Sequence, residues 1–331
     1  MEQLIHADKN RAEIGVVTDY TRFDAQLHHN CALADNTFAL QMTLGAWQAS
    51  KIMRGDCLYI DGTEFGGIVS SVAKDTTTDA VTVKGAVWRA LLAARIIQPP
   101  SGAAYRVYSG VDANAMIADV VDGEFGGLFS VPDITIKTLS AQFRYPTCLA
   151  GLSKALTENG LTLSCIYDAQ EQHVVARART IVDYSDYSDI SSDLGIGMKI
   201  TSGRVDDFNH VVALGSGELE ARMIRELWML DGVVYQSRPA ALAPADVRSF
   251  TFDYPNAESE EELIASATDA LKEYAATASA SIDLSQIQLS LQLDDVITTI
   301  DRDLDIAAKK SVAQRILTMT RDGITIQTEV D

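Results

Sequence analysis

GDCLYID at residues 55–61 and DDVITTID at residues 294–301 decide how this chain is organised. The first stretch is followed by a hairpin pattern from Ile68 to Val83, and the second by another from Val312 to Val330. Each unit consists of an Asp-led strand, a polar loop and a β-hairpin whose apolar residues alternate with polar ones. The pattern indicates either a duplicated β-unit or the chance similarity of any two β-meanders, and both interpretations remain open.

The sequence around these units predicts more strands than helices. Alternating apolar residues predict half-buried strands at Phe38, Leu40, Met42 and Leu44, and again at Ile287, Leu289, Leu291 and Leu293. Shorter strand patterns run from Leu161 to Tyr167 and from Val211 to Leu214, and the last hairpin turns at Arg321-Asp322-Gly323. The chain is therefore expected to be mainly β.

Four segments have helical spacing. Trp88 to Arg95 is stopped by Pro99-Pro100, Met116 to Val121 ends near Gly123, and a third helix has Pro146 in its first turn and ends at Asn159-Gly160. The fourth is best marked, because Ser259 and Glu262 form a capping box ahead of an apolar stripe of Leu263, Ala267, Leu271 and Tyr274.

Composition excludes several classes of protein. The 331 residues include 46 acidic and 27 basic ones, giving a formal net charge of -19, which disfavours general binding to nucleic-acid phosphates. The first residues lack the basic and apolar stretches of an export signal, and no segment has the roughly 20 apolar residues that cross a bilayer. Cys31, Cys57, Cys148 and Cys165 are widely spaced, which favours reduced, mostly buried thiols.

The metal-ligand patterns are weak. His28 and His29 lie near Cys31, but adjacent strand residues point to opposite faces and cannot readily share one ion. Asp301, Asp303 and Asp305 begin like a calcium loop, but Ile306 and Val312 stand where an EF-hand needs Gly and Glu. The acidic series Asp183, Asp186, Asp189 and Asp193 favours a solvated loop. A looser calcium or magnesium site at Asp301, Asp303 and Asp305 stays an alternative to a plain solvated loop, but we expect no metal site and no cofactor.

No catalytic motif is present either. Gly215-Ser-Gly217 is a fragment of a phosphate-binding loop, but Glu218 and Glu220 follow it and would repel a phosphate. The many carboxylates would allow a glycosidase pair almost anywhere, so their abundance is uninformative. We expect no catalytic residues.

The order of segments resembles phage tail baseplate hub proteins, especially those of long non-contractile tails and related prophages. The resemblance rests on Gly55-Asp56, Gly67-Ile-Val69, Val83-Lys-Gly85 with Leu91 to Pro99, Leu149 to Gly160, Asn209 to Gly215 with Gly217-Glu218 and Arg222, Phe252-Asp253-Tyr254, Leu263 to Tyr274, and Asp294 to Val330. It covers nearly the whole chain without a diagnostic signature. Asp294 departs from it, since a Gly before Asp295 would be more typical, and this puts the turn geometry there in doubt.

The resemblance implies a mainly β chain with two tail-tube-like β-barrels and two smaller accessory domains. The expected division is 1–100 for the first barrel, 101–197 for an α/β accessory domain, 198–225 with 285–331 for the second barrel, and 226–284 for an accessory domain with a helix. Two similar barrels in each of three chains would give six units, matching a sixfold tube.

The resemblance also implies the function of a structural virion protein. The chain would be a homotrimeric hub at the tail tip, made in the host bacterial cytoplasm and without stable membrane insertion. It would contact the tail tube and distal tail protein, the tape measure protein and tip or receptor-binding proteins, while DNA passes through without specific binding. The alternatives are a carbohydrate-active or cell-wall-degrading tail enzyme, or the hub of a contractile injection or gene-transfer particle.

Overall fold

The computed structural model describes residues 3–184, 189–191, 198–201, 208–230, 232–274, 279–282, 291–301 and 306–330. The chain forms two compact units, Met1–Met198 with Ser281–Asp331, and Lys199–Ala280. Strands predominate in both, which confirms the prediction of a mainly β chain.

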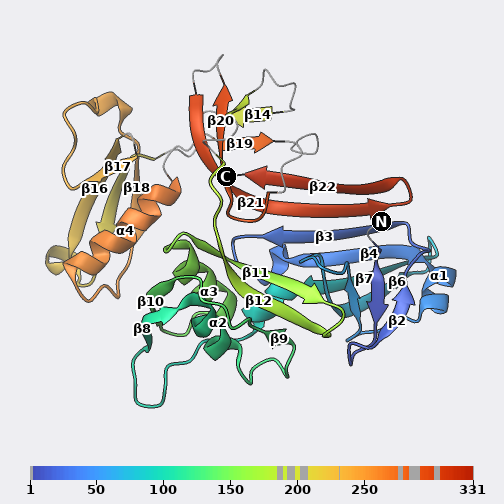
Figure 1. Ribbon diagram of the computed structural model, residues 1–331. Helices are drawn as coiled ribbons and strands as arrows, with labels where there is room; N and C mark the ends of the chain where they lie inside the picture. The colour runs from blue at the N-terminus through green and yellow to red at the C-terminus, as the bar shows by residue number, and fades with distance from the viewer. Residues whose placement is uncertain are drawn as a thin grey trace. The chain divides into compact units, whose positions relative to one another are not determined.

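The first unit is built on a large sheet in which strands from the two ends of the chain pair directly. The strands are β1 (Ile5–Ala7), β2 (Glu13–Val16), β3 (Arg22–His28), β4 (Thr37–Thr43), β5 (Cys57–Tyr59), β6 (Gly66–Asp75), β7 (Ala80–Val87), β13 (Asp189–Ser191), β20 (Val296–Asp301), β21 (Ile306–Thr320) and β22 (Gly323–Val330). Within the described ranges their order is β13-β20-β21-β3-β4-β7-β6-β5-β1-β2, and β22 pairs with β21. Figure 1 shows the blue strand β3 beside the red strand β21.

Period-two patterning explains the central strands. In β3 the buried side chains are Phe23, Ala25 and Leu27, and in β4 they are Phe38, Leu40 and Met42, while their neighbours are more exposed. β3 pairs antiparallel with β4 on one side and with β21 on the other, so it is a central strand. The predicted strand from Phe38 to Leu44 is thus confirmed as β4, and Leu44 begins α1 (Leu44–Ser50).

The two stretches that resemble each other in sequence have the same local geometry. Asp56 accepts a hydrogen bond from the Met53 amide at its Oδ2 (2.8 Å), and its carbonyl accepts from the Val69 amide (2.8 Å). Asp295 repeats both contacts, with the Gln292 amide at 2.8 Å and the Val312 amide at 2.8 Å. Each Asp-led strand therefore joins its hairpin in the same way.

Two further details match. The register of β6 shifts immediately after Val69, and that of β21 shifts immediately after Val312, so each hairpin contains a bulge at the same place. Gly55 and Asp294, the residues before the two aspartates, both have positive φ, at 95° and 66°. Asp294 thus adopts the left-handed turn for which glycine was expected, as Asp does more readily than most residues. These matches support duplication, and the presence of two complete barrels stays a prediction.

Residues 106–180 form an α/β layer on the same unit. Its elements are β8 (Arg106–Asp112), α2 (Ala113–Val121), β9 (Phe129–Ser130), β10 (Thr138–Phe143), α3 (Cys148–Thr157), β11 (Leu161–Asp168) and β12 (His173–Thr180). α3 begins after Thr147, whose hydroxyl accepts from the Ala150 amide at 3.1 Å, so Pro146 precedes the helix instead of opening its first turn. The α/β character predicted for this region is present.

One apolar core joins this α/β layer to the first hundred residues. The ring of Trp88 stacks on Tyr167 with centroids 4.6 Å apart, and Tyr59 packs against Tyr167 at 4.3 Å. Trp88 opens a 3-10 segment (Trp88–Ala94), whereas the sequence indicated a helix without fixing its type. Because these rings belong to one cluster with α2 and α3, the predicted boundary near residue 100 does not separate two cores.

Among the residues described, the second unit is a four-stranded sheet covered by a helix. It contains β15 (His210–Leu214), two 3-10 turns (Leu219–Ala221 and Pro244–Asp246), β16 (Ile224–Leu230), β17 (Val233–Tyr235), β18 (Ser249–Asp253) and α4 (Glu260–Tyr274), with sheet order β17-β16-β15-β18. Leu263, Ala267 and Leu271 of α4 are buried against the sheet. The Ser259 hydroxyl accepts from the Glu262 amide at 3.1 Å, which confirms the N-terminal half of the predicted capping box.

The division of strands between units differs from the predicted division. β15 pairs with β16 and β18 and is covered by α4, so residues 208–225 belong to the second unit and not with 291–330. At the edges of this unit, β14 (Met198–Thr201) pairs with β19 (Ser279–Ile282). Ile287 and Leu289 of the predicted alternating strand lie outside the described residues, whereas Leu291 and Leu293 are buried.

We predict that Asp295→Ala destabilises the first unit by about 3–5 kcal/mol, because the change leaves Arg179 without its buried partner. The measurement is the urea-unfolding midpoint followed by tryptophan fluorescence, since Trp88 lies in this unit. Asp322→Ala, at an exposed hairpin turn, is the control and should change stability by less than about 0.5 kcal/mol. Equal effects of the two changes would contradict this role for Asp295.

Candidate functional site

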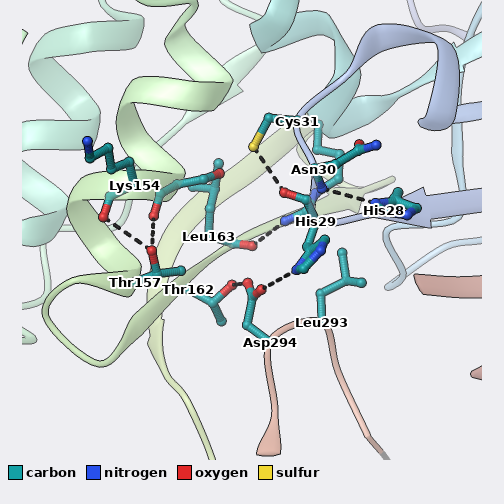
Figure 2. A network of polar contacts seen from close by, with 12 residues as sticks. His28, His29, Asn30, Cys31, Lys154, Thr157, Thr162, Leu163, Leu293 and Asp294 are labelled. Atoms are coloured by element: carbon teal, nitrogen blue, oxygen red, sulfur yellow. Dashed lines mark hydrogen bonds and ion pairs between the residues drawn. The ribbon is translucent and has the colours of Figure 1, made fainter. Parts of the chain in front are cut away.

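A polar junction lies where three distant parts of the first unit meet. His29 follows β3, Thr162 lies in β11, and Asp294 immediately precedes Asp295 ahead of β20. Figure 2 shows the His29 ring and the Thr162 hydroxyl pointing at the Asp294 carboxylate from two sides. The Nδ1 of His29 is 3.6 Å from Asp294 Oδ1, and the Thr162 hydroxyl donates to Oδ2. The junction fixes the C-terminal strands against both the N-terminal sheet and the α/β layer.

The charge of Asp294 is favoured by its partners. Burial alone would raise the pKa of this carboxyl, but contacts with His29 and Thr162 and the positive charge of Arg89 hold the pKa below its usual range. The group is therefore ionised at neutral pH. Its negative charge balances part of the positive charge of buried Arg89, whose guanidinium donates to the Leu163 carbonyl at 2.6 Å.

Asp295 is the second buried carboxylate of the junction. It is 1% exposed, and its Oδ1 accepts from Arg179 Nη1 at 2.8 Å and from the Val182 amide at 3.0 Å. The same guanidinium donates through Nη2 to the Leu293 carbonyl at 3.1 Å. These contacts tie the end of β12 to the start of β20.

The histidine and cysteine pattern serves this junction and does not form a metal cluster. His28 Nδ1 accepts from the Asn30 amide at 3.0 Å, and the Cys31 thiol donates to the His29 carbonyl at 3.2 Å. No three His, Cys, Asp or Glu side chains among the described residues are placed to hold a metal ion. Burial raises the pKa of the Cys31 thiol and that of the buried Cys148 thiol, the latter to about 11, so both remain protonated. All four cysteines are free thiols.

Most of the acidic-loop candidates cannot be placed. Asp303, Asp305, Asp186 and Asp193 lie outside the described residues, and only the backbone of Asp301 and Asp189 is described, in β20 and β13. The interpretation of Asp189 as part of a loop is wrong, because Asp189–Ser191 is a strand parallel to β20. Asp183 forms an ion pair with Lys309.

Gly215 and Gly217 form a tight turn. A Cβ on Gly217 would lie 2.4 Å from the Ala221 carbonyl oxygen, and Gly217 has a φ of 98°. The Arg222 Nε donates to the Gly215 carbonyl at 3.2 Å. Steric and conformational needs explain both glycines without a phosphate.

The large sheet has open strand edges at β22 and at the far half of β6. In the described part of the chain, β22 pairs only with β21, and β6 beyond its bulge pairs only with β7, since β5 reaches no further than Ile68. Ser71 and Ala73 on this half of β6 are exposed. Such an edge offers unpaired amides and carbonyls to a strand of another chain. The corresponding edge of β21 is already occupied, because β3 pairs with it.

No helix in the described residues has the length and apolarity needed to span a membrane. Neither a protein-family model nor a curated protein sequence matches the chain.

Solved structures do match over nearly the full length. A prophage MuSo2 43 kDa tail protein from Shewanella oneidensis has a TM-score of 0.59 at 12% identity, with 100% of this chain and 98% of the other covered. A tail protein from Neisseria meningitidis MC58 has a TM-score of 0.55 at 13% identity, covering 99% and 96%. Prophage tail protein gp18 from Listeria monocytogenes EGD-e gives 0.50 at 11%, covering 99% and 94%. At such identities the similarity establishes a common fold.

The depressed pKa of Asp294 predicts a pH-dependent contribution to stability. A carboxyl whose folded pKa lies below its unfolded value of 3.8 stabilises the fold fully above that value, and the contribution is lost as pH falls through the folded pKa. Asp294→Asn should therefore lower stability at pH 7, and the difference from the unmodified chain should shrink below about pH 4. Urea-unfolding midpoints from pH 7 to pH 3 test this. A difference that stays constant down to pH 3, as expected for exposed Asp322→Asn, would contradict the assignment.

Proposed function

We propose that this chain, which has the fold of phage and prophage tail proteins, is a structural virion protein and acts as the trimeric hub of a tail tip. In this role it joins the tail tube and distal tail ring to the tip, and three copies surround the DNA channel. The observation that carries the proposal is the repeated β-unit. In the C-terminal repeat the free edge of β21 is covered by β3, whereas in the N-terminal repeat the matching edge of β6 is open.

The open edge of β6 gives the ring a specific contact. β20 pairs with the first half of one edge of β21, where Asp295 accepts from Val312, and β3 pairs with the second half. This edge of β21 is therefore paired along most of its length. The matching edge of β6 carries only β5. A strand from a second copy of the chain would complete it, just as β3 completes β21 within one chain.

The neighbour's β14 is the strand we assign to this edge. The pair β14 and β19 precedes β20 in the chain as the pair β3 and β4 precedes β5, with the second compact unit inserted between its two strands. If β14 is the counterpart of β3, then pairing of β14 with β6 of a neighbouring chain repeats the pairing of β3 with β21 inside one chain. Three chains with two repeated β-units each then form a closed ring of six β-units, which matches the symmetry of a sixfold tube.

The acidic composition suits a channel for DNA. A formal charge of -19 per chain is multiplied threefold in a trimer, and negative walls repel the phosphate backbone. DNA would pass without specific binding, and the tape measure protein and tip or receptor-binding proteins are the expected partners on the axis. The same charge also opposes assembly, so trimers should form more readily in moderate salt.

We predict that Ser71→Lys with Ala73→Lys abolishes ring formation and leaves the monomer folded, because both positions are exposed and adjacent charges block strand addition at an edge. Light scattering coupled to gel filtration in 0.15 M salt should give trimers for the unmodified chain and monomers for the variant. Electron microscopy should show a threefold ring only for the former.

The control carries the same two added charges at Thr76 and Thr78, in the turn between β6 and β7, and should still form trimers. An unmodified chain that stays monomeric even with tail-tube or distal tail protein present would overturn the ring. Release of sugars or peptides from bacterial cell walls by the purified chain would contradict a purely structural role.

A further inference from the structure

A cavity of about 340 Å³ opens beside the polar junction, within the first compact unit. It is lined by the loop before β6, by one face of β11 and β12, and by strands near the C-terminus. Its apolar lining includes Ile166 from β11, Leu317 from β21 and Ile326 from β22. The volume is within the range of small-molecule sites.

Cations dominate the polar part of the lining. Arg177, Arg179 and Arg315 line the cavity, and Glu64 is its one carboxylate among the described residues. Arg177 and Arg179 alternate with buried Ala176 and Ala178, so they project from the same face of β12. An excess of positive charge at one place is unexpected in a chain with a formal charge of -19.

Two carboxylates lie near the cavity: Asp295 is paired with Arg179 at 2.8 Å, and Glu64 Oε2 lies 3.4 Å from the Nε of buried Arg89 but accepts no hydrogen bond from the described residues. In the described part of the chain neither Arg177 nor Arg315 forms an ion pair. Arg177 is exposed at the rim, whereas Arg315 is half-buried.

Arg315 carries the clearest sign of a missing partner. Its Nη1 donates to Gln292 Oε1 at 2.7 Å and its guanidinium lies over the Phe65 ring at 5.3 Å, but its buried Nε–H has no hydrogen-bond partner among the residues described. Burial lowers the pKa of this guanidinium, and the negative charges of Glu64 and Asp295 partly offset that effect. A buried donor without an acceptor is costly.

We propose that this cavity is a binding site for a small oxyanion, a carboxylate or phosphate group, held by Arg315 and Arg179 and closed at the rim by Arg177. Guanidinium groups recognise both anions through paired N–H donors, and an oxygen at Arg315 Nε would satisfy the orphaned donor. Because the lining comes from three separate segments of the chain, the bound anion would also hold these segments together.

The test is a titration of the full chain with sodium phosphate and, separately, with sodium malonate, each matched in ionic strength by sodium chloride. Calorimetry should show one saturable site per chain for at least one anion. The melting temperature should rise by about 5 °C or more at a hundredfold excess over the dissociation constant. Phosphate and malonate together separate a preference for a compact inorganic anion from one for a small organic acid.

Two variants assign the binding to the cavity. Arg177→Gln, an exposed change, should fold normally and weaken binding at least fivefold. Arg315→Met should abolish binding, and its melting temperature without added anion should equal or exceed that of the unmodified chain, because a buried donor without an acceptor is removed. Arg54→Gln, which removes an exposed arginine outside the cavity lining, is the charge-matched control and should bind normally.

The proposal is overturned if neither anion shows saturable heat, or if sodium chloride gives the same melting curve. It is equally overturned if Arg177→Gln and Arg54→Gln bind alike, or if Arg315→Met lowers the melting temperature of the anion-free chain. Trimer formation is measured separately, so these outcomes do not depend on the proposed function.

Discussion

The buried carboxylate of Asp295 joins several separate parts of this fold. It accepts from Arg179 at the end of the α/β layer, from the Val182 amide, and from the Gln292 amide that precedes it in the chain. Its backbone carbonyl then accepts from the Val312 amide, which fixes where β21 begins to pair. β3 pairs with β21, so these contacts also position the C-terminal hairpin in the sheet. Because the Asp295 carboxylate is buried, water cannot replace the groups that bind it.

The repetition of that arrangement at Asp56 indicates how one sheet can contain two similar units with different neighbours. Asp56 has the same backbone contacts but faces His6, at 3.0 Å, where Asp295 faces Arg179. The common part of the two units is thus the backbone turn and the bulge, and the different part is the side chain that neutralises the carboxylate. Both turns contain a buried aspartate, whereas the group that pairs with its carboxylate differs with the element packed against it, His6 in one case and Arg179 in the other.

The sequence predicted the elements whose evidence is local. The alternating strand at Phe38 to Met42, the capping box at Ser259 and Glu262, and the hairpin at Asp322-Gly323 all depend on residues within a few positions of one another. It did not predict the division of the strands between units, because β15 joins the second unit through pairing with β18 nearly forty residues later. The polar junction was missed for the same reason. His29, Thr162 and Asp294 have no recognisable spacing in the sequence, although the His28-His29 pair and Asp294 each attracted notice for other reasons.

The arginine cavity shows how little overall composition says about local charge. A net charge of -19 disfavours a broad basic surface, but it places no limit on a recess where three guanidinium groups meet one carboxylate. The alternation of Ala and Arg from Ala176 to Arg179 was the available signal, since it places two cations on one face of a strand whose other face is buried. What the sequence could not supply was Arg315, more than a hundred residues away, or the pairing of Asp295 with Arg179 and the place of Glu64 beside Arg89. Whether a buried polar atom finds a partner is a property of the folded contacts, and here those contacts leave the Nε–H of Arg315 without an acceptor among the described residues.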